Sequence, residues 1–207
     1  MLEVRTLRYC WPGRSQLQLQ GVSLCIAPGE VLGLRAPSGY GKTTLARLLA
    51  AHLPWQDGTL RWAGQPMAPP VPGQAHGVQL VMQHAELAFN PRLRVRHSLG
   101  PHVSSAVFTP LGIQPAWLTR RPHELSGGEL QRLAIARALV PGLKLLIMDE
   151  ATAMHDAISQ ARIWRFMLGQ VRMHSFAMLV LTHDTELLKV VANRIVELST
   201  KGELDAL

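Results

Sequence analysis

Short apolar runs that end in glycine or proline recur along the chain and predict a series of buried strands. The runs cover residues 17–26, 31–34, 78–82, 144–148, 177–181 and 195–198. Between several of them the apolar positions fall at helical spacing, as in residues 42–53 and 129–140. Strands that alternate with helices predict an α/β fold with a largely parallel core sheet, and such sheets bind ligands at the carboxyl ends of their strands.

Two stretches lack this regular pattern. Residues 65–77 are rich in proline, glycine and alanine, which predicts a surface connection with no core of its own. Residues 83–125 are irregular, and we interpret them as a small, partly helical insertion. Prolines interrupt this second stretch at Pro91, Pro101, Pro110, Pro115 and Pro122.

Length and composition indicate one globular domain. A chain of 207 residues is long enough for a full α/β domain and too short for two ordinary ones, so residues 1–207 are expected to form a single domain. A hydrophobic content of 47% with 17% charged residues argues against disorder. No apolar run reaches the roughly 18 to 20 residues that span a bilayer, and residues 1–11 show no secretory signal. We expect a cytosolic protein.

Charge and cysteine content exclude few classes of function. The formal net charge of +7 keeps nucleic acid as a minor alternative, but the basic residues are scattered, apart from Arg92, Arg94 and Arg96. A basic surface equally suits a protein that holds nucleotide phosphates beside an anionic membrane face. Cys10 and Cys25 are predicted to be reduced thiols, and the nine histidines show no metal-ligand spacing, so no structural metal is expected.

The strongest motif is residues 36–44, Ala-Pro-Ser-Gly-Tyr-Gly-Lys-Thr-Thr, placed where a strand gives way to a helix. Its glycines let backbone N–H groups converge on phosphate oxygens, Lys42 can reach the β and γ phosphates, and the Thr43 hydroxyl can bind Mg²⁺. Ala36 stands where the pattern expects glycine, which is acceptable if its φ is negative. A glycine-rich turn without a ligand is the alternative. The predicted nucleotide-binding residues are Ser38, Gly39, Tyr40, Gly41, Lys42, Thr43 and Thr44.

A second motif is the buried strand 144–148, which runs into Asp149 and Glu150. An apolar strand that delivers two acids to its carboxyl end suits Mg²⁺ binding by Asp149 and activation of the attacking water by Glu150. Alone, the run could be any strand that ends at a charged turn. Together with the phosphate loop it predicts nucleotide hydrolysis, with Lys42 and Asp149 converging at adjacent strand ends.

Residues 125–132, Leu-Ser-Gly-Gly-Glu-Leu-Gln-Arg, closely resemble the signature motif of ABC ATPases. The resemblance covers essentially the whole chain. It implies an α/β P-loop NTPase of the ABC type, with a mostly parallel core sheet, an antiparallel β subdomain and a small helical insertion at about residues 84–130. It also implies that Ser126, Gly127 and Gly128 meet the γ-phosphate bound by the opposite subunit, at a helix N-terminus.

Other positions resemble further landmarks of this family. Trp11 resembles the aromatic side chain that stacks on adenine, with Tyr9 as a competitor and a plain core aromatic as the alternative. Gln83 resembles the glutamine that reaches Mg²⁺ and the attacking water, and whose loop touches the membrane subunit. His183 resembles the switch histidine, which hydrogen-bonds the γ-phosphate. The implied catalytic residues are Glu150, His183 and Gln83, and the implied Mg²⁺ ligands are Thr43, Gln83 and Asp149.

Within the family, residues 83–92 with Val95 are similar to ATPases of peptide and nickel importers. Residues 44–49, and Ala151 where proline is usual, are similar to the nickel branch. This resemblance implies ATP and Mg²⁺ as cofactors, integral-membrane permease subunits and a second ATPase as partners, and a solute-binding protein as an indirect partner. It places the chain at the cytoplasmic face of the inner or plasma membrane and implies no nucleic acid. Nickel, a metal-chelator complex and short peptides are all compatible solutes.

One segment departs from the family. Residues 153–156 are Ala-Met-His-Asp, where Ser-Ala-Leu-Asp is typical, so only Asp156 is kept. This departure suggests altered communication between subunits and motivates the hypothesis that the second ATPase is a different chain. The insertion is compact and no C-terminal extension follows the last strand, so a regulatory domain is not expected.

Two other functions are alternatives to transport. One is a soluble ABC ATPase that acts in an enzyme or nucleic-acid assembly; such proteins usually carry fused cassettes, coiled-coil insertions or long basic arms. The other is a degenerate module that binds nucleotide without hydrolysing it. The retention of Lys42, Asp149, Glu150 and His183 argues against the second.

Overall fold

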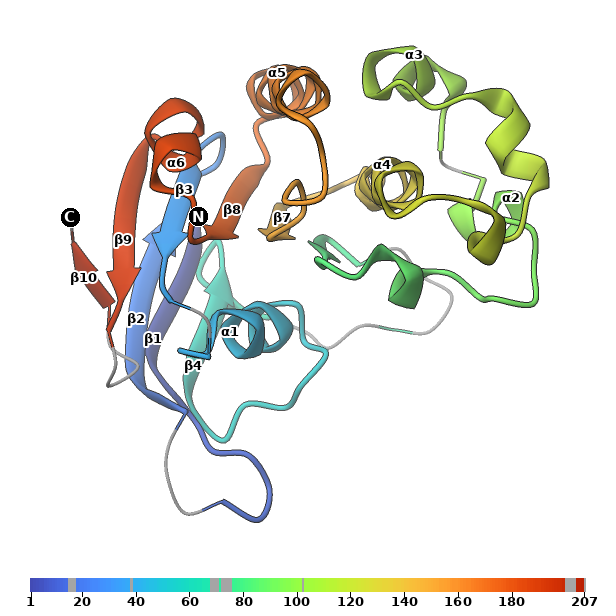
Figure 1. The fold of residues 1–207 in the computed structure, drawn as a ribbon. Helices are drawn as coiled ribbons and strands as arrows, with labels where there is room; N and C mark the ends of the chain where they lie inside the picture. The colour runs from blue at the N-terminus through green and yellow to red at the C-terminus, as the bar shows by residue number, and fades with distance from the viewer. Residues whose placement is uncertain are drawn as a thin grey trace.

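The computed structural model describes residues 1–14, 18–37, 39–67, 71, 76–101, 103–199 and 204–206. Two β-sheets form its frame (Figure 1). The strands are β1 (Leu2–Tyr9), β2 (Leu19–Ile26), β3 (Val31–Arg35), β4 (Asp57–Trp62), β5 (Gln65–Pro66), β6 (Val78–Val81), β7 (Leu145–Asp149), β8 (Ala177–Thr182), β9 (Arg194–Leu198) and β10 (Leu204–Ala206). The longer helices are α1 (Lys42–Leu49), α4 (Gly127–Ala138), α5 (Ala157–His174) and α6 (Thr185–Val191).

The larger sheet has six strands in the order β10-β9-β3-β8-β7-β6. From β9 to β6 all neighbours run parallel, and only β10 pairs in the antiparallel sense. Every residue of β7 and β8 is buried, as expected for strands that are covered on both faces. The predicted α/β fold with a largely parallel sheet is therefore confirmed.

The smaller sheet is antiparallel, in the order β2-β1-β4-β5. The apolar pattern predicted neither β1 nor β4. In β1 the pairing register with β2 shifts near Thr6, whose φ is 48°, so the alternation of buried and exposed positions is broken. The predicted surface connection at 65–77 needs a correction because its first two residues form β5, which pairs with β4. The remainder of that connection lies largely outside the described residues.

Two hydrophobic cores cover the two faces of the parallel sheet. Alternate residues of β7 serve each core: Leu145 and Ile147 face the antiparallel sheet and α1, whereas Leu146 and Met148 face α4, α5 and the insertion (Figure 1). Helix α6 packs closely on β3 because residue 33 is a glycine. A Cβ there would lie 2.9 Å from Leu188 Cδ2.

The insertion between β6 and α4 consists of short helical turns, as predicted. Its elements are η1 (Ala85–Ala88), α2 (Arg96–Leu99), η2 (Ser105–Val107), α3 (Phe108–Leu111), η3 (Pro115–Thr119) and η4 (Pro122–Glu124). Buried Leu111, Ile113 and Trp117 join the insertion to the core that contains α4 and α5. Within the described part of the chain, no helix combines the length and apolarity needed to cross a bilayer.

Helix boundaries differ from the apolar pattern for local reasons. Helix α1 ends at Leu49 instead of residue 53, since Ala51 takes a left-handed conformation with φ 55°. Helix α4 begins two residues earlier than predicted because Ser126 caps it, and it ends at Ala138.

Candidate active site

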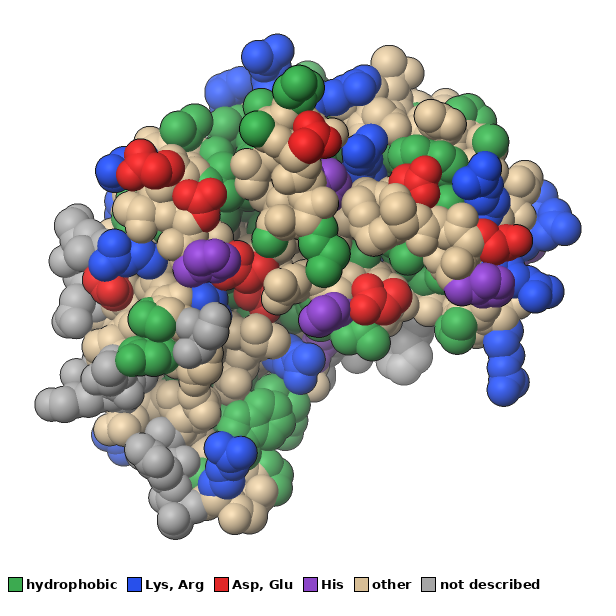
Figure 2. All heavy atoms as spheres, viewed as in Figure 1, with side chains coloured by type: hydrophobic (Ala, Val, Ile, Leu, Met, Phe, Trp, Pro, Cys, Tyr) green, Lys and Arg blue, Asp and Glu red, His purple; other side chains and the backbone are tan. Residues whose placement is uncertain are grey.

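A cleft of about 350 Å³ opens where α1 begins and where β7 and β8 end. Figure 2 shows acidic, histidine and basic side chains meeting over this region. The cleft is lined by Gln18, Gly39, Gly41, Lys42, Thr43, Thr44, Gln83, Asp149, Glu150 and His183. All except Gln18 are residues that the sequence singled out, and the structure brings them together from four separate segments of the chain. Ser38 lies outside the described residues.

The phosphate loop leaves β3 at Arg35 and enters α1 at Lys42, with Gly41 as the N-terminal cap. Gly41 has φ 97°, and a Cβ at this position would lie 3.1 Å from Leu19 Cδ2, so glycine is required twice over. The first turn of α1 contains no acidic residue, which leaves its N–H groups and its dipole available to an anion.

Ala36 fits the loop without strain. It is not among the described non-glycine residues with positive φ, so the condition for alanine at this position is met. Its carbonyl oxygen accepts a hydrogen bond from Lys42 Nζ. Gln18, which the apolar pattern did not reveal, donates from Nε2 to the Gly39 carbonyl oxygen at 3.1 Å. Tyr40 is half-buried and packs against the core instead of lining the cleft.

Asp149 lies at the end of β7 and is hydrogen-bonded through Oδ2 to the Thr43 hydroxyl at 2.7 Å. The prediction of adjacent strands was wrong, because β8 lies between β3 and β7, and the loop and α1 bridge that distance. Burial raises the pKa of the Asp149 carboxyl, and the charge of Glu150 adds to this, whereas the Thr43 hydrogen bond and Lys42 lower it.

Asp149 Oδ1 is buried and has no hydrogen-bond partner among the described residues. A buried carboxylate oxygen without a partner is costly unless a cation or water meets it. The Thr43 hydroxyl and the Gln83 amide line the same cleft, and Mg²⁺ prefers oxygen ligands of these kinds. The donor set therefore fits Mg²⁺.

Glu150 is held by several partners at once. Its Oε1 lies 2.9 Å from His183 Nδ1 and 3.6 Å from Lys42 Nζ. The backbone N–H of His183 donates to the same oxygen at 3.1 Å, and the Thr182 hydroxyl donates to Oε2 at 3.0 Å. Thr182 was not identified from the sequence, although it directly precedes His183. Glu150 also has φ 49°, a strained backbone conformation of the kind that concentrates at functional sites.

Comparison with known proteins decides the family. The sequence pattern of the ABC transporter family matches residues 19–153. The nickel import ATP-binding protein NikE of Escherichia coli K12 is 34% identical over 198 residues, covering 87% of this chain and 74% of that protein. The chain belongs to the ABC transporter family. A putative peptide import ATP-binding protein of Brucella abortus strain 2308 is 33% identical over 193 residues, covering 84% of this chain and 58% of that protein.

Solved ABC structures share the fold. The dimeric ATP-binding cassette MJ0796, in a post-hydrolysis state bound to ADP and Pi, superposes with a TM-score of 0.85 at 20% identity, covering 100% of this chain and 99% of that one. The cassette cbiO1 from Clostridium perfringens gives a TM-score of 0.78 at 21% identity, with 99% and 86% covered. The predicted ABC-type fold, the ATPase class and the resemblance to nickel and peptide import ATPases are thus confirmed. The roles of individual residues remain predictions.

The signature motif of this ABC subunit is not part of the cleft in its own chain. Ser126 caps α4: its hydroxyl accepts from the Glu129 N–H at 3.3 Å, and the Glu129 carboxylate accepts from the Ser126 N–H at 2.8 Å. Ser126 and Gly127 are exposed, and Gly128 is partly exposed. In the described part of the chain, these residues do not line the cleft and do not touch its carboxylates.

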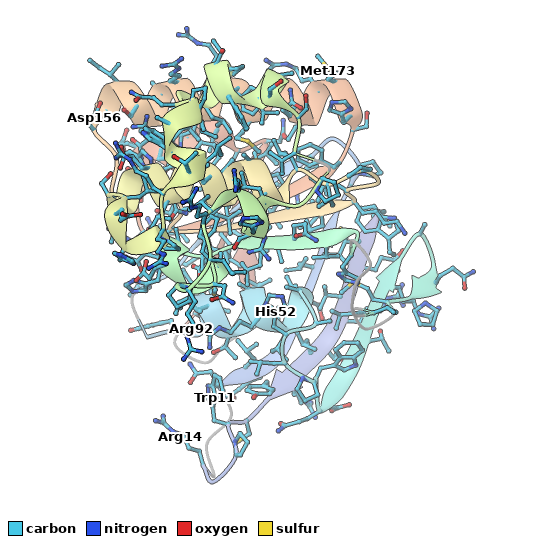
Figure 3. The ribbon with its side chains drawn as sticks, turned by 90° about the vertical axis from the view of Figure 1, so that its right-hand side faces the viewer. Trp11, Arg14, His52, Arg92, Asp156 and Met173 are labelled. Atoms are coloured by element: carbon cyan, nitrogen blue, oxygen red, sulfur yellow. The ribbon has the colours of Figure 1, made fainter. Side chains whose placement is uncertain are left out.

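Trp11 and Tyr9 have different environments. Tyr9 is only 3% exposed, and its ring lies edge-on to that of Trp11, with centroids 5.3 Å apart. Trp11 is partly exposed at the end of β1, beside the loop that contains Arg14 (Figure 3). Only Trp11 of this pair therefore offers ring surface to a ligand.

Proposed function

We propose that this ABC ATPase powers the import of nickel, a metal-chelator complex or a short peptide through permease subunits that are separate chains. The names of the relatives from Escherichia coli and Brucella abortus support import and these solute classes. One observation carries the catalytic part: the Thr43–Asp149 pair, at 2.7 Å, and the Glu150–His183 pair, at 2.9 Å, share one cleft with Lys42.

In this proposal the triphosphate of ATP lies at the N-terminus of α1, where Lys42 balances the charge of the β and γ phosphates. Ser38, Gly39, Tyr40, Gly41 and Thr44 complete the loop. Thr43, Gln83 and Asp149 would hold Mg²⁺, which supplies charge neutralisation at the phosphates when bound.

Glu150 accepts a proton from the attacking water, and the water oxygen forms the new bond to the γ-phosphorus as the bond to ADP breaks. His183 can hydrogen-bond the γ-phosphate while it keeps its contact with Glu150, because its side chain is 69% exposed at the cleft. Trp11 stacks on the adenine ring, because Tyr9 is buried.

We further propose that residues 1–207 act as one domain that closes on a second ATPase across two bound nucleotides. Ser126, Gly127 and Gly128 then meet the γ-phosphate of the partner, which their exposure away from their own cleft allows. The departure at residues 153–156 supports a partner with a different sequence. The Gln83 loop passes closure to permease subunits at the cytoplasmic membrane face, and a solute-binding protein delivers the solute.

The catalytic assignment is tested by ATPase measurements on the complex assembled with its permease subunits. Glu150→Gln is expected to lower the rate by about 10² to 10⁴-fold, because the amide cannot accept the proton. Glu186→Gln on α6 is the matched control, since Glu186 is exposed and pairs only with Lys189 in the described structure. Parental turnover by Glu150→Gln would contradict the proposal.

Nucleotide uptake is tested separately by calorimetry. Lys42→Ala is expected to abolish measurable ATP binding, and Lys189→Ala to leave it unchanged. Permease-independent ATPase activity would favour a soluble role instead. Mass measurement of the intact transporter tests the partner, since two copies of this chain and no other ATPase would contradict the heteromeric arrangement.

A further inference from the structure

The segment that departs from the family forms a tight turn directly after the catalytic carboxylates. We call residues 150–156 the Glu150 turn. The Ala153 N–H donates to the Glu150 carbonyl oxygen, and the His155 N–H donates to the Thr152 carbonyl oxygen, both at 3.2 Å. The turn ends at Asp156, whose side chain accepts from the Ser159 N–H and caps α5 (Figure 3). Its conformation therefore links Glu150 to α5.

Two of the three side chains that are unusual in this turn pack against the signature glycines. A Cβ on Gly127 would lie 3.3 Å from Met154 Sδ, and a Cβ on Gly128 would lie 3.7 Å from His155 Nε2. The Glu150 turn thus contacts the first turn of α4 through Met154 and His155. These two contacts join the turn that follows Glu150 to the signature motif of the same chain.

His155 occupies this position at a cost. Both of its ring nitrogens are buried, and neither forms a hydrogen bond of good geometry with the described residues, although the ring lies against the backbones of Gly128 and Thr152. Leucine, the typical family residue, would pack here without that penalty, so packing alone does not account for an imidazole. A buried polar group without a partner calls for a functional explanation.

The surroundings favour the neutral imidazole. Burial and the charge of Arg132 lower the pKa of His155, while the backbones of Gly128 and Thr152 and the charge of Asp156 raise it. Arg132 comes from α4, and Glu150, His183 and Asp184 line the same cavity as His155. Helix α5 contributes the neutral side chains Gln160 and Trp164 to that cavity.

This cavity, of about 380 Å³, connects His155 to the reaction centre, since Glu150 and His183 line it as well. On its far side the Thr152 hydroxyl accepts hydrogen bonds from Gln160 Nε2 and Trp164 Nε1, both at 3.1 Å. The Thr152 side of the Glu150 turn is therefore fixed by hydrogen bonds to α5. On the side that faces α4, the position of the turn depends on the packing of His155.

We propose that His155 is a positioning residue for ATP hydrolysis, whose neutral imidazole fixes the Glu150 turn against Gly128. It keeps Glu150 and the signature motif of one subunit in a set arrangement, so that both are in place when two ATPases close. Protonation introduces a charge between Arg132 and the N-terminus of α4, where the helix dipole also disfavours a cation. The turn is then displaced from α4. This inference rests on the proposed function of Ser126, Gly127 and Gly128.

The test compares four forms of the assembled transporter: the parent, His155→Leu, His155→Gln and His174→Leu. The ATPase rate of each is measured from about pH 8 to about pH 5, the range in which histidine titrates. His174 is exposed at the end of α5 and controls for the loss of an imidazole. Any pH effect that the four proteins share cancels when the rate of each variant is divided by that of the parent.

Below the pKa of His155, the ratio of the His155→Leu rate to the parent rate is expected to rise, by up to about tenfold per pH unit. The ratio for His174→Leu should stay constant. If His155→Leu does not fold, His155→Gln, which is polar but does not titrate, decides by the same ratio. Identical pH profiles for the parent and the folded His155 variants would overturn the proposal.

Thermal unfolding separates this inference from the proposed function. The pKa of His155 in the folded chain lies below the ordinary 6.5, so folding stability is full above that pH and declines as the pH falls below it. His155→Leu is expected to remove this component of the decline. A parent complex without ATPase activity would refute the proposed function, while the melting temperatures would still decide whether His155 is held neutral against α4.

Discussion

The phosphate cleft and the face formed by the signature motif differ in how completely their polar groups are paired. In the cleft, Glu150 is held by Lys42, Thr182 and His183. Asp149 Oδ1 has no hydrogen-bond partner among the described residues, and it fits a metal ion. On the signature face, the buried ring nitrogens of His155 lack a hydrogen bond of good geometry among the described residues, where Ser126 bonds within its own cap. One chain thus brings the cleft residues together by itself, whereas in the proposed pair of ATPases the signature face would be completed by the second subunit.

This difference predicts a hierarchy of mutational effects. A substitution in the cleft removes a side chain whose partners are in the same chain. It should therefore impair ATP binding or hydrolysis in the isolated chain and in the assembled transporter. A change on the signature face should act only in the closed pair of ATPases. The three predictions that follow test this contrast, beginning with the largest effect.

Thr43→Val should lower the ATPase rate by about two orders of magnitude. The substitution removes the hydroxyl that binds Asp149 and would bind Mg²⁺, so the pKa of the buried Asp149 rises further and neither of its oxygens keeps a protein partner. Stability should fall by about 1 to 3 kcal/mol. Steady-state kinetics and thermal unfolding measure both effects. Thr59→Val, at an exposed position on β4, is the control. Equal effects of the two substitutions would contradict the role given to Thr43 in the cleft.

Ser126→Ala should lower hydrolysis by about tenfold in the assembled transporter, and leave ATP binding by the isolated chain unchanged. The lost hydroxyl belongs to the signature face, and the lost cap of α4 should cost about 1 kcal/mol. Ser104→Ala removes a similar cap, on the Ala106 N–H of η2, far along the insertion, and should leave hydrolysis intact. Weakened ATP binding by isolated Ser126→Ala protein would contradict the division between the two faces.

Trp11→Ala should have the smallest effect, a rise of about threefold to tenfold in the Kd for ATP with little change in kcat. Stacking on adenine contributes to binding equally before and during hydrolysis, so it does not change the barrier. Calorimetry measures the affinity. Trp62→Ala removes another partly buried tryptophan that packs on the same core and serves as control. If both substitutions leave the Kd unchanged, Trp11 is a core aromatic.

Much of the site was predictable because its motifs are local. The nine residues from 36 to 44 carry the phosphate loop, and a single strand leads into both carboxylates, so each could be identified from spacing alone. Gln18 was missed because its link to the site is a hydrogen bond to Gly39, which is distant in sequence. Thr182 was missed because it bonds distant Glu150 and directly precedes His183, which was already assigned. The interrupted alternation in β1 similarly concealed a strand.

The sequence by itself determined the alternating strands and helices and the phosphate loop, because these depend on side chains within a few residues of one another. Only the tertiary structure decided that β8 separates β3 from β7, that Thr43 meets Asp149 across 106 residues, and that His155 packs against α4. Strand order and burial arise from the packing of whole sheets and helices, and no local pattern encodes them.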